Sequence, residues 1–414
     1  MPSKDFPIVN LSAKDVFPGL DSLISDSRFN RVDHAIHGLF NKSVTRLENG
    51  YPFIITGDIP AMWLRDSTWQ VAPLFHSKHP EVIEFLIALS KTQIELFLID
   101  PYANAFNPAA NGHCWHKDFV DQSPWVFERK YELDSWASVL YLARMIVQKY
   151  GRLDHIDSSF KQALELMLKL ARKEQHHNPE SYIFMRNNGV PHDSLSHNGY
   201  GAPLGYTGMV YSAFRPSDDA CVYGFLVPSN FFFLNELELL PGKLKSAESI
   251  AISSEIKKGL EEFAIIDGRY AYEVDGLGNS LFIDDANIPS LLSLPLLGCI
   301  SLDDNVYKAT REFILSGKNP FYFAGRKAEG VGSQHTPANY VWPIALAVQA
   351  LTDPSVDKKL EMLELLEKTD AGTGNMHEAF NVNDDTEFTR PWFSWADMSY
   401  VELVLASVEY SFVN

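Results

Sequence analysis

The chain has 414 residues, 46% of them hydrophobic and 13% aromatic, and a formal net charge of −18. This length is enough for two ordinary domains or for one large domain. An acidic surface repels phosphate backbones and anionic lipids, so we expect neither a nucleic acid nor a membrane as partner. Neutral ligands such as sugars are compatible with this charge.

The cysteines indicate no disulfide framework and no zinc site. Cys114, Cys221 and Cys299 are widely spaced and odd in number, and no CxxC pair occurs. The N-terminus lacks the apolar run of a secretory signal, and no stretch of about 18 apolar residues follows it. We therefore expect a cytoplasmic protein, and no metal or other cofactor is indicated.

Helical periodicity dominates the chain from its first third onward. Apolar residues recur at helical spacing over 31–47, 82–98, 134–149 and 157–173. Further helices are predicted over 219–240, 245–264, 286–297, 303–315, 337–352, 356–368 and 395–411. Strands are few: one over Phe53–Ile55, and a short pair near Phe263–Tyr272 with its turn at Gly268.

The regions between these helices are long polar loops, at 51–67, 100–131, 174–217, 317–337 and 370–395. No Gly/Ser-rich or Pro-rich linker divides the chain, and no repeat of 34 or 40 residues is present. Long ordered loops commonly carry function. We predict a single domain over 1–414, a barrel of paired helices with its loops gathered at one mouth.

The first loop holds the most informative cluster, which contains Asp58, Trp63, Arg65 and Asp66. Two carboxylates and a guanidinium cost several kcal/mol in apolar packing unless they are paired. They suit a wet, concave site in which an aromatic face meets a polyhydroxylated ligand. The alternative is a surface turn with an ordinary Asp–Arg pair.

A second cluster contains Ser217, Asp218 and Asp219. Ser217 is a plausible N-cap for the helix predicted to follow, with both acids in its first turn, where the helix dipole favours carboxylates. Adjacent acids also repel each other, so one of them can have a raised pKa if it is shielded from water. Such an acid is what protonation of a leaving oxygen requires.

A third cluster places His377 and Glu378 beside a Gly-rich turn, with Arg390, Trp392 and Trp395 able to close around them. A solvated glutamate beside core aromatics is the alternative interpretation. The zinc motif HExxH is absent because position 381 is asparagine, and GxSxG, GxGxxG and GxxxxGK[ST] are absent as well.

Two further polar and aromatic runs contain Asn107, Arg129, Glu132 and His335. Arg129 and Glu132 could simply pair with each other at a helix start. Taken together, separated carboxylates in aromatic-lined loops on a helical scaffold are the minimum equipment for glycoside hydrolysis.

At these clusters the chain resembles glycoside hydrolase family 125, the metal-independent, inverting exo-α-1,6-mannosidases. The similarity spans nearly the whole chain, in the runs ITGDIPAMWLRDS (55–67), DPYANAFN (100–107), ERKYELDS (128–135), FRPSDDA (214–220), PSNFF (228–232), HTP (335–337), MHEAF (376–380) and TRPWFSWA (389–396). Two positions depart from the expected pattern: Trp69, where a small residue is expected, and the loop 108–122 with Cys114 and Trp115.

The resemblance implies an all-α (α/α)6 barrel that removes non-reducing terminal α-1,6-linked mannose from mannosides or N-glycan fragments. It implies that the general acid is Asp218 or Asp219, with a slight preference for Asp218, and that the general base is Glu378. The residues expected to bind the sugar are Asp58, Trp63, Arg65, Asp66, Asn107, Arg129, Glu132, His335, His377 and Arg390.

An inverting pair of carboxyl groups lies ~6.5–9.5 Å apart, which leaves room for a water molecule. Two alternatives remain open on the same scaffold. One is a sugar epimerase that uses His335 and His377 for proton transfer, and the other is a carbohydrate-binding protein without catalysis.

Overall fold

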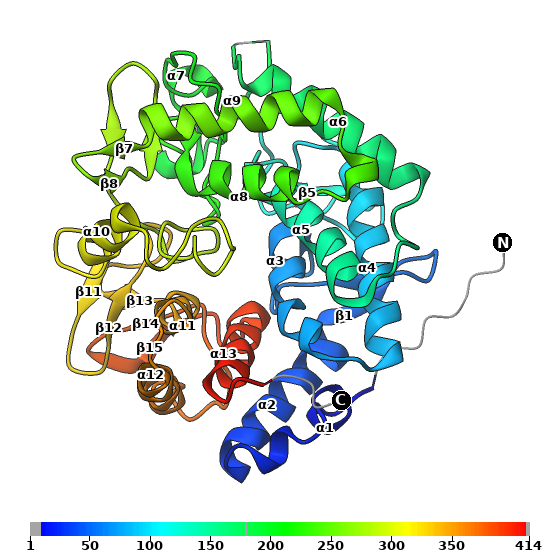
Figure 1. Ribbon diagram of the computed structural model, residues 1–414, viewed down its shortest axis with the longest axis vertical. Helices are drawn as coiled ribbons and strands as arrows, with labels where there is room; N and C mark the ends of the chain where they lie inside the picture. The colour runs from blue at the N-terminus through cyan, green and yellow to red at the C-terminus, as the bar shows by residue number, and fades with distance from the viewer. Residues whose placement is uncertain (1–9, 179, 411–414) are drawn as a thin grey trace.

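The computed structural model describes residues 10–178 and 180–410. Its helices form two concentric rings, seen end-on in Figure 1. The outer helices are α2 (Asp26–Gly38), α4 (Pro80–Ile99), α6 (Ser158–Glu174), α9 (Ala247–Phe263), α10 (Asn305–Ile314) and α12 (Val356–Lys368). The inner helices are α3 (Leu64–Trp69), α5 (Leu133–Tyr150), α8 (Val227–Glu238), α11 (Pro343–Leu351) and α13 (Ser394–Ser407).

Outer and inner segments alternate along the chain, and the ring closes where its two ends meet. Helix α3 packs against α5, α5 against α8, and α11 against α13, while α13 also contacts α2 and α3. The predicted all-α (α/α)6 barrel is therefore confirmed. That the chain is a single domain over 1–414 stays a prediction, because residues at both ends lie outside the described part.

The two rings differ in how their side chains are buried. Outer helix α6 buries one face, with Phe160, Ala163, Leu164 and Met167 at helical spacing, and Asp157 caps its first amides. Inner helix α13 is buried on nearly every side. An amphipathic helix needs one partner surface, whereas an inner helix is covered by both neighbours and by the outer ring.

The sixth inner position is irregular chain, and here the predicted helix 286–297 is wrong. Residues 286–300 form bends and turns instead. Pro289 and Pro295 lack amide hydrogens, and the Asp284 carboxylate accepts the amides of Leu291 and Leu292. Side chains therefore satisfy backbone donors that a helix would have used. Ile288 and Leu296 nevertheless line a cavity together with residues of α5, α11 and α13.

Other predicted boundaries shift for local reasons. The helix predicted over 31–47 begins at Asp26, because Ser25 caps the amide of Arg28, and ends in a wide turn over Leu39–Ser43. The helix predicted over 219–240 begins only at Val227, and that predicted over 337–352 begins at Pro343. The last helix ends at Ser407, and residue 411 of its predicted range lies outside the described residues. The remaining helices agree within about two residues of prediction.

Short antiparallel strands tie the loops together, more of them than the sequence predicts. The pairings are β1 (Val44–Arg46) with β2 (Pro52–Ile54), β3 (Met62–Trp63) with β4 (Ala105–Phe106) and β5 (Val126–Glu128), β6 (Phe225–Leu226) with β9 (Glu273–Val274) and β10 (Ser280–Leu281), β7 (Ile265–Ile266) with β8 (Arg269–Tyr270), β11 (Tyr322–Ala324) with β12 (Glu329–Val331), and β13 (Tyr340–Val341) with β14 (Ala379–Asn381) and β15 (Asp384–Thr389). The short helices α1 (Ala13–Val16) and α7 (Ser196–Gly199) lie outside the two rings.

In the part of the chain that the structure describes, no helix combines the length and the hydropathy needed to cross a membrane. Over the same residues, no group of three or more His, Cys, Asp and Glu side chains is arranged to hold a metal ion.

Candidate active site

A cavity of about 170 Å³ opens where the N-terminal ends of inner helices α3, α11 and α13 converge with the loops. Trp395, near the start of α13, lines both this cavity and a second cavity of about 220 Å³. The lining of the first cavity is polar and aromatic: Thr56, Ile59, Trp63, Arg65, Asp66, Pro216, Ser217, Asp218, Asn287, His335, Trp342, Glu378, Arg390, Phe393 and Trp395.

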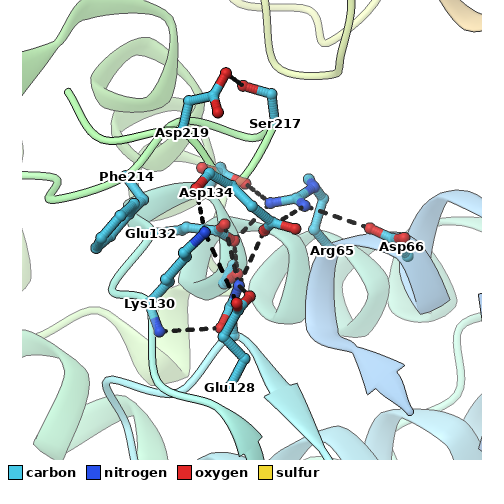
Figure 2. Close-up of polar contacts among 12 residues, drawn as sticks. Arg65, Asp66, Glu128, Lys130, Glu132, Asp134, Phe214, Ser217 and Asp219 are labelled. Atoms are coloured by element: carbon cyan, nitrogen blue, oxygen red, sulfur yellow. Dashed lines mark hydrogen bonds and ion pairs between the residues drawn. The ribbon is translucent and has the colours of Figure 1, made fainter. Parts of the chain in front are cut away.

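Arg65 is the electrostatic centre of this site (Figure 2). Arg65 is 2% exposed, and its guanidinium lies among four carboxyl groups. Nη1 is 2.5 Å from Glu132 and 3.1 Å from Asp134, while Nη2 is 3.5 Å from Asp66 and 3.7 Å from Asp218. Burial alone would lower the pKa of Arg65, but these carboxylates raise it well above its usual value. One cation thus holds acids from three separate segments.

Asp66 is a buried acid of this group that, like Asp218, lines the cavity. Burial raises its pKa to about 6, although Arg65 opposes this. The neighbouring carboxylates of Asp218 and Glu378 add to the increase. The pKa of Asp66 therefore depends on the charges of both carboxylates predicted to do the chemistry.

The loop 214–220 does not begin a helix, which corrects the prediction that Ser217 is an N-cap with both acids in a first turn. Phe214 and Ala220 pair as an isolated bridge, and the amide of Asp218 donates to the carbonyl of Arg215. Asp218 has a left-handed φ of 66°, which aspartate tolerates better than most residues. The buried ammonium of Lys130 donates to the carbonyl of Asp218 at 2.6 Å and fixes this tight turn.

The turn sends the two neighbouring acids to different places. Asp218 lines the cavity with its side chain 21% exposed, whereas Asp219 is fully buried. Asp219 Oδ1 lies 3.5 Å from His335 Nδ1, and His335 lines the cavity in its place. Burial lowers the pKa of His335, but its close contact with Asp219 and the charge of that carboxylate raise it to about 9. His335 is therefore a cation at neutral pH.

Glu378 is held in place by Arg390, which also contacts the loop that precedes β3. Arg390 Nη1 lies 3.5 Å from Glu378 Oε1, Arg390 Nε donates to Asp58 at 2.7 Å, and its Nη2 donates to Thr56 at 3.1 Å. The guanidinium of Arg390 also stacks over Phe393. Arg390 thereby ties the loop that follows β15 to the loop that precedes β3, with Glu378 between them.

Several polar atoms of the cavity residues have no hydrogen-bond partner among the described residues. They are Trp63 Nε1, Arg65 Nε, Asp66 Oδ1 and Asn287 Nδ2. A buried polar atom without a partner costs about 1–3 kcal/mol. Donors and an acceptor in one small aromatic pocket suit a ligand that carries several hydroxyl groups, because each hydroxyl both donates and accepts.

The structure brings together most of the residues predicted for the site, but not all of them. Trp63, Arg65, Asp66, Asp218, His335, Glu378 and Arg390 line the cavity. Glu132 and Asp58 do not line it: buried Glu132 holds Arg65, and exposed Asp58 holds Arg390.

Asn107, Arg129 and His377 are engaged elsewhere. Asn107 donates to the carbonyls of its own loop, and Arg129 pairs with Asp100 at 2.6 Å. The predicted alternative pairing of Arg129 with Glu132 is therefore wrong. His377 stacks on Phe388 at 3.7 Å and contacts two backbone carbonyls, so it fixes the chain next to Glu378 without lining the cavity.

Sequence reasoning missed Asn287 and Trp342. Asn287 lies in the segment predicted as a buried helix, so its amide was not expected to face a ligand. Trp342 precedes the first turn of α11 inside a predicted helix, where an aromatic residue indicates core packing. The polar run Asp284, Asp285 and Asn287 between two apolar stretches was the available signal.

Carboxyl groups and unpartnered polar atoms in an aromatic pocket, at one mouth of an (α/α)6 barrel, define the class: a glycoside hydrolase. Comparison with known proteins agrees. Residues 18–405 match the family described as metal-independent alpha-mannosidase, glycoside hydrolase family 125. The chain belongs to this family of α-mannosidases.

Individual relatives are similar over most of the chain. The Meiotically up-regulated gene 157 protein of Schizosaccharomyces pombe (strain 972 / ATCC 24843) is 37% identical over 395 residues, which cover 87% of this chain and 77% of that protein. A metal-independent α-mannosidase from Streptococcus pneumoniae, solved as a non-productive complex with α-1,6-mannobiose, superimposes with a TM-score of 0.90 at 40% identity and covers 94% of this chain and 97% of its own. A wild-type glycosidase at 12% identity and a TM-score of 0.52, covering 96% of this chain and 99% of its own, shares the fold.

Proposed function

We propose that this protein is an exo-acting, inverting α-1,6-mannosidase that removes non-reducing terminal mannose from mannosides or N-glycan fragments. The observation that carries the proposal is the small cavity that Asp218 and Glu378 both line, with its unpartnered polar atoms. The α-1,6-mannobiose bound to the Streptococcus pneumoniae relative supports the linkage. Cytoplasmic location stays a prediction.

In the proposed mechanism Asp218 is the general acid and Glu378 is the general base. Asp218 protonates the glycosidic oxygen as its bond to the anomeric carbon breaks. Glu378, held beside Arg390, removes a proton from a water molecule that attacks the other face of the ring. The burial of Asp219 and its engagement with His335 support Asp218 over Asp219 as the acid.

The remaining cavity residues bind and orient the terminal sugar in this proposal. Asp66 Oδ1, Arg65 Nε, Trp63 Nε1 and Asn287 Nδ2 are available for its hydroxyl groups. His335 adds a positive charge at the wall. The proposed epimerase alternative loses support because His377 packs on Phe388 and does not line the cavity.

The test is incubation of the protein with α-1,6-mannobiose, followed by proton NMR from the first minutes. We expect free mannose that appears first as the β-anomer, and no larger product from longer chains. Glu378→Gln should reduce kcat by about 10²–10⁴-fold with folding intact. Mannose that appears first as the α-anomer would refute inversion, and a fully active Glu378→Gln variant would refute the base.

A further inference from the structure

The side-chain amide of Asn104 lies among three carboxyl groups. Its Nδ2 is 3.0 Å from Asp218 Oδ1, 3.1 Å from Glu128 Oε2 and 3.2 Å from Glu132 Oε1. An amide nitrogen carries two hydrogens, so it can donate to only two of the three oxygens. At least one of the three oxygens therefore has no hydrogen of its own from this amide.

Glu132 and Asp218 are close enough to share a proton. Glu132 Oε1 and Asp218 Oδ1 lie 3.2 Å and 3.0 Å from the same nitrogen, Asn104 Nδ2, and both carboxyl groups contact Arg65. Two ionised carboxylates held this close in a buried site repel each other, which favours a proton on one of them. The pair therefore holds one proton and titrates as a unit.

The surroundings of the pair indicate where the proton lies. Glu132 faces Arg65 from α3, Asp134 and Ser135 from its own helix, and Glu128 from β5 across Asn104. Burial, together with the charges of Asp218 and Asp134, raises its pKa well above the usual value despite Arg65. Burial would also raise the pKa of Asp218, but the hydrogen bond from Glu132 and the charges of Lys130 and Arg65 lower it.

This distribution leaves a difficulty for the mechanism. A general acid must carry a proton when the glycosidic bond breaks, yet in the free protein the surroundings of the pair favour that proton on Glu132. Glu132 can give the proton to Asp218, because the glutamate carboxylate that remains would still contact Arg65 at 2.5 Å and Ser135 at 3.0 Å.

We propose that Glu132 stores the proton that Asp218 delivers to the leaving oxygen, an inference that rests on the function proposed above. When substrate fills the cavity, the proton moves from Glu132 to Asp218. Asp218 then gives it to the glycosidic oxygen, which takes the electron pair of the breaking bond to the anomeric carbon. Glu378 accepts a proton from the attacking water and later releases it to solvent, and the Glu132–Asp218 pair takes up one proton from solvent.

Neither of the other acids at Arg65 fits this role. Asp134 is directed to Arg65 and to Ser229, and it has no hydrogen bond to Asp218. Asp66 lies in the cavity wall with an unpartnered oxygen, which suits contact with a sugar hydroxyl. Asp134→Asn is therefore the matched control, since it also removes a carboxylate from Arg65.

The experiment compares Glu132→Gln, Asp134→Asn and Asp218→Asn on two substrates. α-1,6-Mannobiose needs a proton on its leaving oxygen, whereas α-mannosyl fluoride releases fluoride without one. Glu132→Gln should lower kcat on mannobiose by about 10²-fold, in the range of general acid catalysis, and should lower kcat on the fluoride no more than Asp134→Asn does. The basic limb of its pH profile should also move to lower pH, because Asp218 alone is more acidic than the pair. Asp134→Asn should lower kcat on both substrates by a similar factor.

The outcomes separate the two proposals. If Asp218→Asn leaves kcat on the fluoride unchanged but Glu132→Gln lowers kcat on both substrates equally, the role of Glu132 as proton store is refuted and the assignment of Asp218 as the acid stands. If Asp218→Asn also lowers kcat on both substrates equally, the assignment of Asp218 itself fails.

A second measurement does not depend on the folding of Glu132→Gln. In protein with ¹³C-labelled glutamate carboxyls, infrared spectra at pH 7 should show the band of a protonated glutamate that disappears in Asp218→Asn. A band that does not respond to the glutamate label, or that survives in Asp218→Asn, would overturn the inference.

Discussion

The charge of His335 depends on Asp219, and Asp219→Asn tests this dependence with almost no change in shape. His335 Nδ1 lies 3.5 Å from Asp219 Oδ1, and the histidine side chain is 36% exposed toward the cavity. Burial alone would lower the pKa of His335, and it is Asp219 that raises it to about 9. Asparagine keeps the volume of Asp219 and removes its charge.

The size of the effect follows from this distance. Two unit charges 3.5 Å apart interact by about 1–2.5 kcal/mol at an effective dielectric of roughly 40–80, which suits a side chain open to water. Each pKa unit corresponds to about 1.4 kcal/mol. Asp219→Asn should therefore lower the pKa of His335 by about 1–2, from about 9 to roughly 7–8.

Stability should change with pH in a defined direction. The folded pKa of His335 lies above its unfolded value of 6.5, so protonation stabilises the folded state fully below pH 6.5. This contribution is lost as the pH rises through about 9. The difference in unfolding free energy between wild type and Asp219→Asn should accordingly shrink between these two pH values.

The assay is an NMR titration of the His335 imidazole in both proteins, with urea unfolding at several pH values and KM for mannobiose between pH 7 and 9. We expect KM of the variant to rise over this range while kcat below pH 7 stays near wild type. An imidazole that still titrates near pH 9 in Asp219→Asn would refute the reasoning. Loss of turnover on mannobiose with α-mannosyl fluoride spared would instead make Asp219 the acid.

Three further changes test separate features. Lys130→Met removes a buried ammonium that pairs with the half-buried Asp193 and donates to the carbonyl of Asp218, so urea unfolding at pH 7 should show a loss of about 1–3 kcal/mol. The loss should shrink below pH 4, since the pKa of Asp193 is lowered to about 2, and an unchanged unfolding midpoint would contradict it. Gly57→Ala places a Cβ 2.8 Å from the carbonyl oxygen of Trp392 at a φ of +145°. It should lower the free energy of unfolding by about 1–3 kcal/mol more than the control Gly19→Ala, where an added Cβ meets open space. Equal melting temperatures of the two variants would argue against this close approach. Trp115, 62% exposed, contacts Phe127, which packs on Trp63 of the cavity wall. Trp115→Ala should raise KM roughly 2- to 10-fold for α-1,6-linked chains longer than mannobiose, and a rise shared by mannobiose would assign Trp115 a role in the loop alone.

The outer ring could be predicted from sequence because each outer helix has one apolar face and one wet face. Helix α6 shows this pattern, and its observed bounds agree with prediction within one residue. The segment 286–297 has the same apolar spacing, yet its two prolines and the Asp284 carboxylate favour turns. Periodicity reports burial, but it does not report where backbone donors go.

The runs that build the site could be predicted from sequence, but not always which residue of a run reaches the cavity. Trp63, Arg65 and Asp66 stand together in one run and line one cavity. Arg129 and Glu132 are also close in sequence, but Glu132 immediately precedes α5 and contacts Arg65, while Arg129 contacts Asp100. The direction of the chain at the start of α5 sends Arg129 and Glu132 to different partners, and the spacing of the two charges in the sequence does not reveal this.

The geometry of the barrel explains how so many acids coexist in its mouth. Glu132 and Asp134 sit at the start of α5 and Asp66 in the first turn of α3, so amide groups and helix dipoles reduce the cost of their negative charge. Even so, Arg65 is one cation among four carboxyl groups, and full ionisation of all four in a buried site is unfavourable. We therefore expect a proton to remain within the group, and in the proposal above it lies on Glu132, which shares the Asn104 amide with Asp218. In the proposed mechanism, the excess of carboxylates that indicates a sugar hydrolase from the sequence also supplies the general acid with its proton.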